Sequence, residues 1–278
     1  MGKRFGLIGH PVEHSMSPVM HNDAFRSCQI DATYEAFDVG AGDLEEVAEK
    51  LRSGELDGVN VTIPHKVAIM NFLDEIDRDA EVIGAVNTIV RRGEKLIGYN
   101  TDGAGYWESL VSYLPHDTSA LNVLVIGAGG ASRAVCAAFL NAGVAHLVVA
   151  NRTEEKAATL LNLINTKQQS TEACSLAEAK TKLNQFDVVI NTSSVGMSPH
   201  TDQLPLSLDN LKKDAVVSDL IYNPMETAFL KEAKAKGAIT VNGVGMFVNQ
   251  GALSFEHWTG VKPDRSRMTN IVTNKLGG

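Results

Sequence analysis

The alternation of apolar and polar residues in the first third of the chain predicts strands and helices that follow one another in turn. We predict strands at 4–9, 33–39 and 58–63, helices at 17–28 and 43–52, a short helix from about residue 66, and a hairpin of strands at 85–90 and 95–99. Ser17 followed by Pro18 predicts a helix N-cap, and Asp43 with Glu46 predicts an acidic capping box. These elements predict a compact α/β domain over residues 1–101.

A second series follows a predicted helix at 102–114 and a polar stretch, 115–119, that we interpret as a hinge. We predict strands at 121–126, 145–150, 186–191, 215–219 and 238–241, with helices at 131–140, 153–164 and 226–236. Because parallel strands need helical crossovers, this order predicts a doubly wound, Rossmann-like domain at 102–245. Two further helical segments in 246–278 have wide apolar faces, and we expect them to pack back on the first domain.

The stretch LNVLVIGAGGASR, residues 121–133, predicts a strand, a tight turn and the start of a helix. Gly127 permits a backbone angle that a side chain would forbid, and Gly129 lets the main chain approach a pyrophosphate. The free amides of the helix start favour negative charge. The spacing is G-x-G-x-x-S, with Ser132 where Gly or Ala is preferred, so an ordinary strand-to-helix turn remains the alternative to a dinucleotide site.

Asn151, Arg152 and Thr153 follow the next predicted strand, where an NAD site would carry Asp or Glu. A carboxylate there binds the ribose hydroxyls, whereas a guanidinium offers a planar fork of donors to a 2′-phosphate. The sequence therefore predicts NADP as the cofactor. The alternative for Arg152 is a solvated basic residue at a strand end.

Composition narrows the class of protein. The 278 residues carry a net charge of -8 and are 44% hydrophobic, which suits two domains with sizeable cores. Without a basic stretch we expect no nucleic-acid partner, and without a long apolar segment we expect no membrane partner and a cytoplasmic enzyme. Cys28, Cys136 and Cys174 lack metal-ligand spacing, as do His10 and His14, so we expect neither a disulfide nor a metal.

Polar residues gather at the predicted strand ends, where a doubly wound sheet collects its ligands. They are Ser15 and Ser17; Asn60, Thr62, His65 and Lys66; Asn87 and Thr88; and Asn100, Thr101 and Asp102. Such side chains suit a small substrate rich in oxygen. Lys66 and Asp102 are the ionisable residues whose charges could pair and exchange a proton, so we interpret them as catalytic. The alternative for Lys66 is a surface lysine at a helix start.

Nine short stretches occur in one order over nearly the whole chain. They are HSMSP (14–18), NVTIPHK (60–66), GAVNT (84–88), YNTD (99–102), GAGGASRA (127–134), NRT with Lys156 (151–156), NTSSVGM (191–197), DLIYNP (219–224) and NGVGMFVNQGA (242–252). Together they resemble the shikimate dehydrogenases. The resemblance implies an NADP-dependent oxidoreductase that reversibly reduces 3-dehydroshikimate to shikimate by hydride transfer in aromatic amino-acid biosynthesis. The alternatives are a quinate/shikimate dehydrogenase of broader specificity and a non-catalytic NADP-binding regulatory module.

The same resemblance implies roles for individual residues. Those implied for the substrate are Ser15, Ser17 and Tyr222 at the carboxylate, Thr62, Asn87 and Gln250 at the ring hydroxyls, and Lys66 and Asp102 at the oxygen that changes oxidation state. Those implied for the cofactor are Gly127, Ala128, Gly129, Gly130 and Ala131 at the pyrophosphate, Asn151, Arg152, Thr153 and Lys156 at the 2′-phosphate, and Leu220 and Gly243 at the nicotinamide. We expect a monomer or a homodimer.

Overall fold

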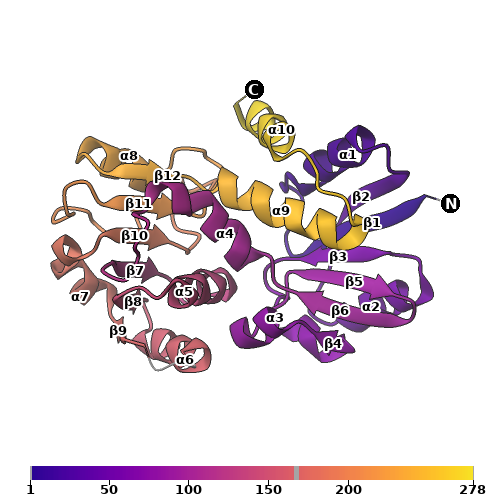
Figure 1. The fold of residues 1–278 in the computed structure, drawn as a ribbon, viewed down its shortest axis with the longest axis horizontal. Coiled ribbons are helices and arrows are strands. Elements are labelled where there is room, and N and C mark those ends of the chain that lie inside the picture. Colours follow the sequence, from indigo (N-terminus) through magenta and orange to yellow (C-terminus); the bar gives the residue numbers. More distant parts are fainter. Residues whose placement is uncertain (1, 166–168, 278) are drawn as a thin grey trace. The chain divides into compact units, whose positions relative to one another are not determined.

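The computed structural model describes residues 2–165 and 169–277, and the chain divides into two compact units (Figure 1). One unit comprises Met1–Gly105 and Val248–Gly278, and the other comprises Tyr106–Phe247. The chain passes from one unit to the other within helices α4 (Asp102–Leu110) and α9 (Val244–Thr259). The assignment of one unit to the substrate and of the other to the cofactor stays a prediction. No helix in the described ranges is long and apolar enough to cross a membrane.

The first unit is built on a mixed six-stranded sheet in the order β2-β1-β3-β5-β6-β4. Its strands are β1 (Lys3–Gly9), β2 (Ala32–Asp38), β3 (Gly58–Val61), β4 (Glu75–Ile76), β5 (Thr88–Arg92) and β6 (Lys95–Tyr99). β1 pairs in parallel with β2 and β3, whereas β5 runs antiparallel to β3 and β6, so the predicted hairpin is confirmed. The sequence did not predict β4, because two residues are too few to show a period.

Helices pack around this sheet. They are α1 (Ser17–Ser27), α2 (Leu44–Ser53), α3 (Arg78–Ile83), α10 (Arg265–Gly277) and the 3-10 helix η1 (Ala68–Phe72). The predicted apolar stripe of α2 is buried at Leu44, Val47, Ala48 and Leu51. α10 packs against α1, as expected for the C-terminal helices, and there Arg267 Nε donates to Asp23 Oδ2 at 2.6 Å. This arginine lowers the pKa of Asp23.

The predicted N-cap at Ser17 is wrong, whereas Asp43 does stand at the N-cap of α2 but forms no capping bond. Met16 is the N-cap of α1 and Ser17 its first residue, and no described side chain caps the helix. The Ser17 N–H donates instead to Ser15 Oγ at 3.2 Å. Asp43 is the N-cap of α2, but its Oδ2 accepts from the Gly40 N–H at 3.2 Å rather than from the helix. For Asp43, the Gly40 N–H thus competes with the helix for the carboxylate.

The second unit holds an all-parallel six-stranded sheet in the order β12-β11-β10-β7-β8-β9. Its strands are β7 (Asn122–Ile126), β8 (His146–Ala150), β9 (Thr171–Cys174), β10 (Val188–Asn191), β11 (Val216–Asp219) and β12 (Ile239–Val241). Its helices are α5 (Gly130–Ala142), α6 (Glu154–Ile164), α7 (Leu176–Thr181) and α8 (Ala228–Ala235), with 3-10 helices η2 (Val111–Tyr113) and η3 (Leu183–Gln185). If β7 is numbered 1 and the strands that follow it in the chain are numbered 2 to 6, the order across the sheet, read from β9, is 3-2-1-4-5-6. This order confirms the predicted Rossmann-like winding.

Both faces of this sheet are covered. Val123 and Val125 of β7 belong to one apolar cluster, and Leu124 and Ile126 belong to another on the opposite face. A strand buried on both sides is a continuous apolar run, which explains why this segment stood out in the sequence. The strand order changes direction next to β7, and the carboxyl ends of β7 and β10 therefore flank the position where such sheets bind ligands.

Candidate active site

Lys66 and Asp102 form an ion pair in the first unit. Lys66 lies beyond the end of β3, and Asp102 is the first residue of α4. Lys66 Nζ lies 2.6 Å from Asp102 Oδ2, and the two side chains are only 15% and 6% exposed. The structure therefore brings together the two ionisable residues singled out in the sequence, although they are 36 positions apart. Their catalytic role stays a prediction.

Asn87 holds the other oxygen of this carboxylate. Its Nδ2 donates to Asp102 Oδ1 at 2.9 Å, and its Oδ1 accepts from the Thr101 N–H at 2.9 Å. A backbone N–H can only donate, so this contact determines which end of the amide faces Asp102. The Asp102 N–H donates to Asn100 Oδ1 at 3.0 Å. The carboxylate thus accepts from an ammonium on one side and from an amide on the other.

The remaining residues implied for the substrate lie in two places. Ser15 Oγ donates to Ser17 Oγ at 3.2 Å, and Thr62 is half-buried on the turn before Lys66. Gln250 of α9 joins the pair's surroundings, because Asn87 Nδ2 lies 3.4 Å from its Oε1. Tyr222 belongs to the second unit, where its ring lies 4.5 Å from that of Phe247. Ser15, Ser17, Thr62 and Gln250 are in the first unit together with the ion pair.

The histidines of the first unit do not form a metal site. His65 is buried and turned away from the ion pair, with Nε2 2.7 Å from the Val39 carbonyl oxygen. His21 is fully buried, its ring stacks on that of Tyr34 at 4.4 Å, and neither ring nitrogen has a partner among the described residues. Burial lowers the pKa of His21 to about 3. Across residues 2–165 and 169–277, no group of His, Cys, Asp or Glu could hold a metal ion.

The glycine turn of the second unit is shaped for an anion. Gly127 has φ +112, a backbone angle that disfavours any side chain, and a Cβ on it would also lie 2.7 Å from Thr192 Oγ1. Both the backbone angle and this contact therefore exclude a side chain. Gly129 is the N-cap of α5, and a Cβ there would meet no described atom within 4 Å. No described side chain caps the first turn of α5, so its first amides are left to solvent or to an anion.

Ser132 fits the third position of the turn. Its side chain is fully buried, and its Oγ donates to the Gly127 carbonyl oxygen at 2.7 Å. A serine is small enough for the helix to approach the strand, and its hydroxyl is satisfied by the turn itself. The departure from the preferred glycine or alanine is therefore compatible with a dinucleotide-binding turn.

Two cationic side chains follow β8. Arg152 and Lys156 are exposed, with the exposed Glu154 and Glu155 between them, and neither cation forms an ion pair within the described part of the chain. Asn151 Nδ2 donates to the Thr153 carbonyl oxygen at 2.8 Å, which orders the turn that carries them. An unpaired guanidinium and an ammonium at this edge suit a phosphate rather than a pair of ribose hydroxyls.

Leu220 and Gly243 are in direct contact. A Cβ on Gly243 would lie 2.1 Å from the Leu220 carbonyl oxygen, so only glycine permits this approach. The Gly243 N–H donates to the Ile221 carbonyl oxygen at 3.1 Å. The segment after β11 is thereby held against the segment after β12, and both contribute residues implied for the nicotinamide.

Asp219, which the sequence patterns did not single out, anchors this segment. Asp219 is 1% exposed, and its Oδ1 accepts from the Ile221 N–H and from Asn191 Nδ2, both at 3.1 Å. Its Oδ2 accepts from Thr227 Oγ1 at 2.7 Å. Burial raises the pKa of Asp219 to about 6 against these three donors. The available signal was its place at the end of an apolar strand, in the stretch DLIYNP.

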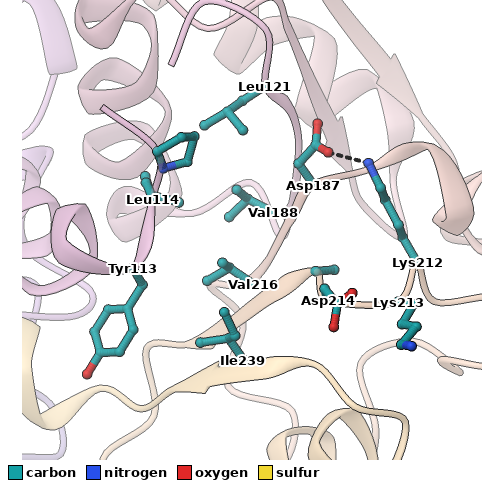
Figure 2. A pocket seen from close by; sticks show the side chains of 12 residues that line it. Tyr113, Leu114, Leu121, Asp187, Val188, Lys212, Lys213, Asp214, Val216 and Ile239 are labelled. Atoms are coloured by element: carbon teal, nitrogen blue, oxygen red, sulfur yellow. Dashed lines mark hydrogen bonds and ion pairs between the residues drawn. The ribbon is translucent and has the colours of Figure 1, made fainter. Parts of the chain in front are cut away.

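A pocket of about 410 Å³ lies at the amino ends of strands β7, β10, β11 and β12 (Figure 2). Leu121, Val188, Val216 and Ile239 line it, and each stands just before or at the start of a parallel strand. The glycine turn and Asp219 stand at the opposite ends of the same strands. This pocket is therefore distinct from the candidate cofactor site.

Three family descriptions match the chain. Residues 7–89 match the shikimate dehydrogenase substrate binding domain, residues 110–220 match shikimate / quinate 5-dehydrogenase, and residues 243–273 match the shikimate 5'-dehydrogenase C-terminal domain. A shikimate dehydrogenase (NADP(+)) of Shouchella clausii is 52% identical over 277 residues, with 99% of this chain and 100% of that protein covered. The corresponding protein of Bacillus subtilis is 48% identical, with 100% and 99% covered.

A solved structure agrees with these matches. The crystal structure of shikimate 5-dehydrogenase from Thermus thermophilus, in complex with NADP(H) and shikimate, superposes with a TM-score of 0.89. It is 36% identical to this chain, and the match covers 99% of this chain and 100% of that one.

Proposed function

The chain belongs to the shikimate dehydrogenase family, and we propose that it catalyses the reversible, NADP-dependent reduction of 3-dehydroshikimate to shikimate in aromatic amino-acid biosynthesis. Relatives that share about half of its residues over the full length are named for this activity. The observation that carries the proposal is the ion pair of Lys66 and Asp102, nearly buried among amides and hydroxyls.

This pair supplies what ketone reduction needs from the protein. Negative charge develops on the carbonyl oxygen, and it must receive a proton from a donor within hydrogen-bond reach. The Lys66 ammonium donates that proton, and Asp102 accepts a hydrogen bond from it and thereby fixes its direction. In the oxidative direction the proton returns to the pair.

The second unit is suited to NADP. When bound, NADPH supplies the hydride that reduces the carbonyl carbon. The amides of Gly130 and Ala131 at the start of α5 would contact its pyrophosphate, since Gly129 leaves open space in front of them. Arg152 and Lys156 would pair with the 2′-phosphate. Leu220 and Gly243 would line the nicotinamide site, with Asp219 holding the segment behind them.

An absorbance assay of the purified protein tests the proposal. With shikimate and NADP+, we expect absorbance at the nicotinamide wavelength to rise, and with NAD+ we expect a much slower rise. Quinate is the informative second substrate, because the matched family description covers both acids. Equal rates with quinate and shikimate would favour the broader enzyme. Binding of NADP+ without turnover of either acid would contradict the proposed activity and favour a regulatory module.

Two further expectations rest on the sequence alone. We propose a cytoplasmic location, and a monomer or homodimer, as predictions that fractionation and light scattering would test.

A further inference from the structure

A buried polar network joins helix α9 to the candidate catalytic pair. Its centre is Ser254 Oγ, on a side chain with no solvent exposure. This oxygen lies 2.9 Å from Asn60 Nδ2, 2.7 Å from Thr88 Oγ1 and 3.2 Å from Thr101 Oγ1. The Gln250 carbonyl oxygen, one helical turn earlier, also lies 2.9 Å from this hydroxyl. One hydroxyl on α9 therefore contacts β3, β5 and the residue before α4.

The directions of these hydrogen bonds follow from counting protons. Because the one proton of Thr88 Oγ1 goes to Asn87 Oδ1, the 2.7 Å contact requires Ser254 to donate to Thr88, and the Ser254 oxygen then accepts from Asn60 and Thr101. Asn60 Nδ2 can only donate, which is consistent with this direction. Thr101 Oγ1 accepts from Asn87 Nδ2 at 2.9 Å, so its own proton can point to Ser254. Ser254 thus offers the Thr101 hydroxyl an acceptor, as Asn87 Oδ1 does at the same distance of 3.2 Å.

The same chain of bonds sets the amide of Asn87. Its Oδ1 accepts from the Thr101 N–H and from Thr88 Oγ1, both at 2.9 Å. Its Nδ2 therefore faces Asp102 Oδ1 at 2.9 Å. If the amide turned over, its carbonyl oxygen would face the carboxylate and the Thr101 N–H would lose its acceptor. Both changes carry an electrostatic cost in a buried site.

We propose that Ser254 is a positioning residue for the reaction: it holds the Thr101 and Thr88 hydroxyls, and through them the Asn87 amide, so that Asp102 stays aligned with Lys66. This inference rests on the proposed function. A hydroxyl on a helix can bond back one turn, but that bond alone explains no further contacts. Ser254 makes three more, and two of them, to Thr88 and Thr101, lead on to the Asn87 amide. Preorganisation of this kind raises kcat, because it sets the geometry in which the proton is transferred.

Ser254→Ala tests the inference against a matched control. Thr259 lies on the same helix, and its Oγ1 donates back to the Phe255 carbonyl oxygen at 2.7 Å, without contact to the network. We expect Ser254→Ala to lower kcat for shikimate oxidation by about tenfold, the scale of one buried hydrogen bond. Thr259→Ala should stay within about twofold of wild type, and both variants should bind NADP+ as wild type does.

A double-mutant cycle separates positioning from mere packing. If Ser254 acts through Asn87, then Ser254→Ala should lower kcat by less than about twofold in an Asn87→Ala background. Equal losses in both backgrounds, or an equal loss in Thr259→Ala, would overturn the inference. Should Ser254→Ala fail to fold, as seen by circular dichroism, the same cycle is run with Thr101→Val. A wild-type protein without turnover would refute the proposed function itself, whereas an active wild type matched by its Ser254 variant refutes only the positioning role.

Discussion

Replacing Asp219 by Asn should make the stability of the second unit less dependent on pH. The carboxyl is 1% exposed and accepts three hydrogen bonds, yet burial raises its pKa from 3.8 to about 6. The folded state then holds the proton more tightly than the unfolded state does. The stabilisation is complete below the unfolded pKa, and it is lost as the pH rises through the folded pKa.

The size of the effect follows from the shift in the pKa. A difference of about two units corresponds to about 3 kcal/mol between low and neutral pH. Roughly 2 kcal/mol of this change falls between about pH 4.5 and about pH 7.5, a range in which folding can be measured. The amide that Asp219→Asn introduces does not ionise. The free energy of unfolding of the variant should therefore rise by this amount relative to that of wild type as the pH rises.

Urea unfolding can report on the second unit alone. Trp107 belongs to that unit and packs edge-on against Phe139 at 5.6 Å, whereas Trp258 belongs to the first. In a Trp258→Phe background, Trp107 emission therefore follows the unit that holds Asp219. We expect the difference in unfolding free energy between Asp219→Asn and the background protein to grow by about 2 kcal/mol over this pH range.

Thr227→Val provides the opposite control. Thr227 Oγ1 donates to Asp219 Oδ2 at 2.7 Å, so its removal should raise the pKa of Asp219 further and steepen the loss of stability with pH. Thr227 is also the N-cap of α8, and losing this cap should lower the free energy of unfolding by about 1 kcal/mol at every pH. A difference between Asp219→Asn and its background that is constant with pH would refute the reasoning.

Four further predictions concern both units. Lys66→Ala should lower turnover by about two to four decades while NADP binding persists, and near-normal turnover in the absorbance assay would rule out its role as proton donor. Arg152→Asp should weaken NADP binding about ten- to a hundredfold by titration, and an unchanged preference for NADP over NAD would contradict its contact with the 2′-phosphate. Gly243→Ala should weaken NADP binding at least about tenfold, because its Cβ would displace the Leu220 carbonyl, whereas Gly42→Ala, with no described atom within 4 Å of the new Cβ, should not. Burial lowers the pKa of His21 to about 3, so its contribution to stability is present above its unfolded pKa and is lost on acidification. Between about pH 7 and about pH 4, the free energy of unfolding of His21→Leu, measured with urea, should therefore fall by about 3 kcal/mol less than that of wild type. Parallel losses would show that His21 has the same pKa in the folded and unfolded states.

The sequence by itself determined the features that depend on local pattern. The stripe of α2, the doubly buried run of β7 and the glycine turn before α5 were all predicted within a few residues. Each depends on periodicity or on backbone freedom over fewer than about fifteen residues, which is legible without tertiary contacts. The family resemblance added the order of nine separated stretches, which local pattern alone does not interpret.

Only the tertiary structure decided which side chains meet and what surrounds them. β4 has only two residues, and β9 is mostly polar with only Cys174 buried, so neither stands out as an apolar run; each pairs with one neighbouring strand. Ser254 lies 166 positions from Thr88, and nothing in the pattern of α9 assigns it to the catalytic pair. The pKa of Asp219 likewise depends on what covers it. Hydrogen bonding and desolvation act between atoms that the fold brings together, so they are decided only when distant segments pack.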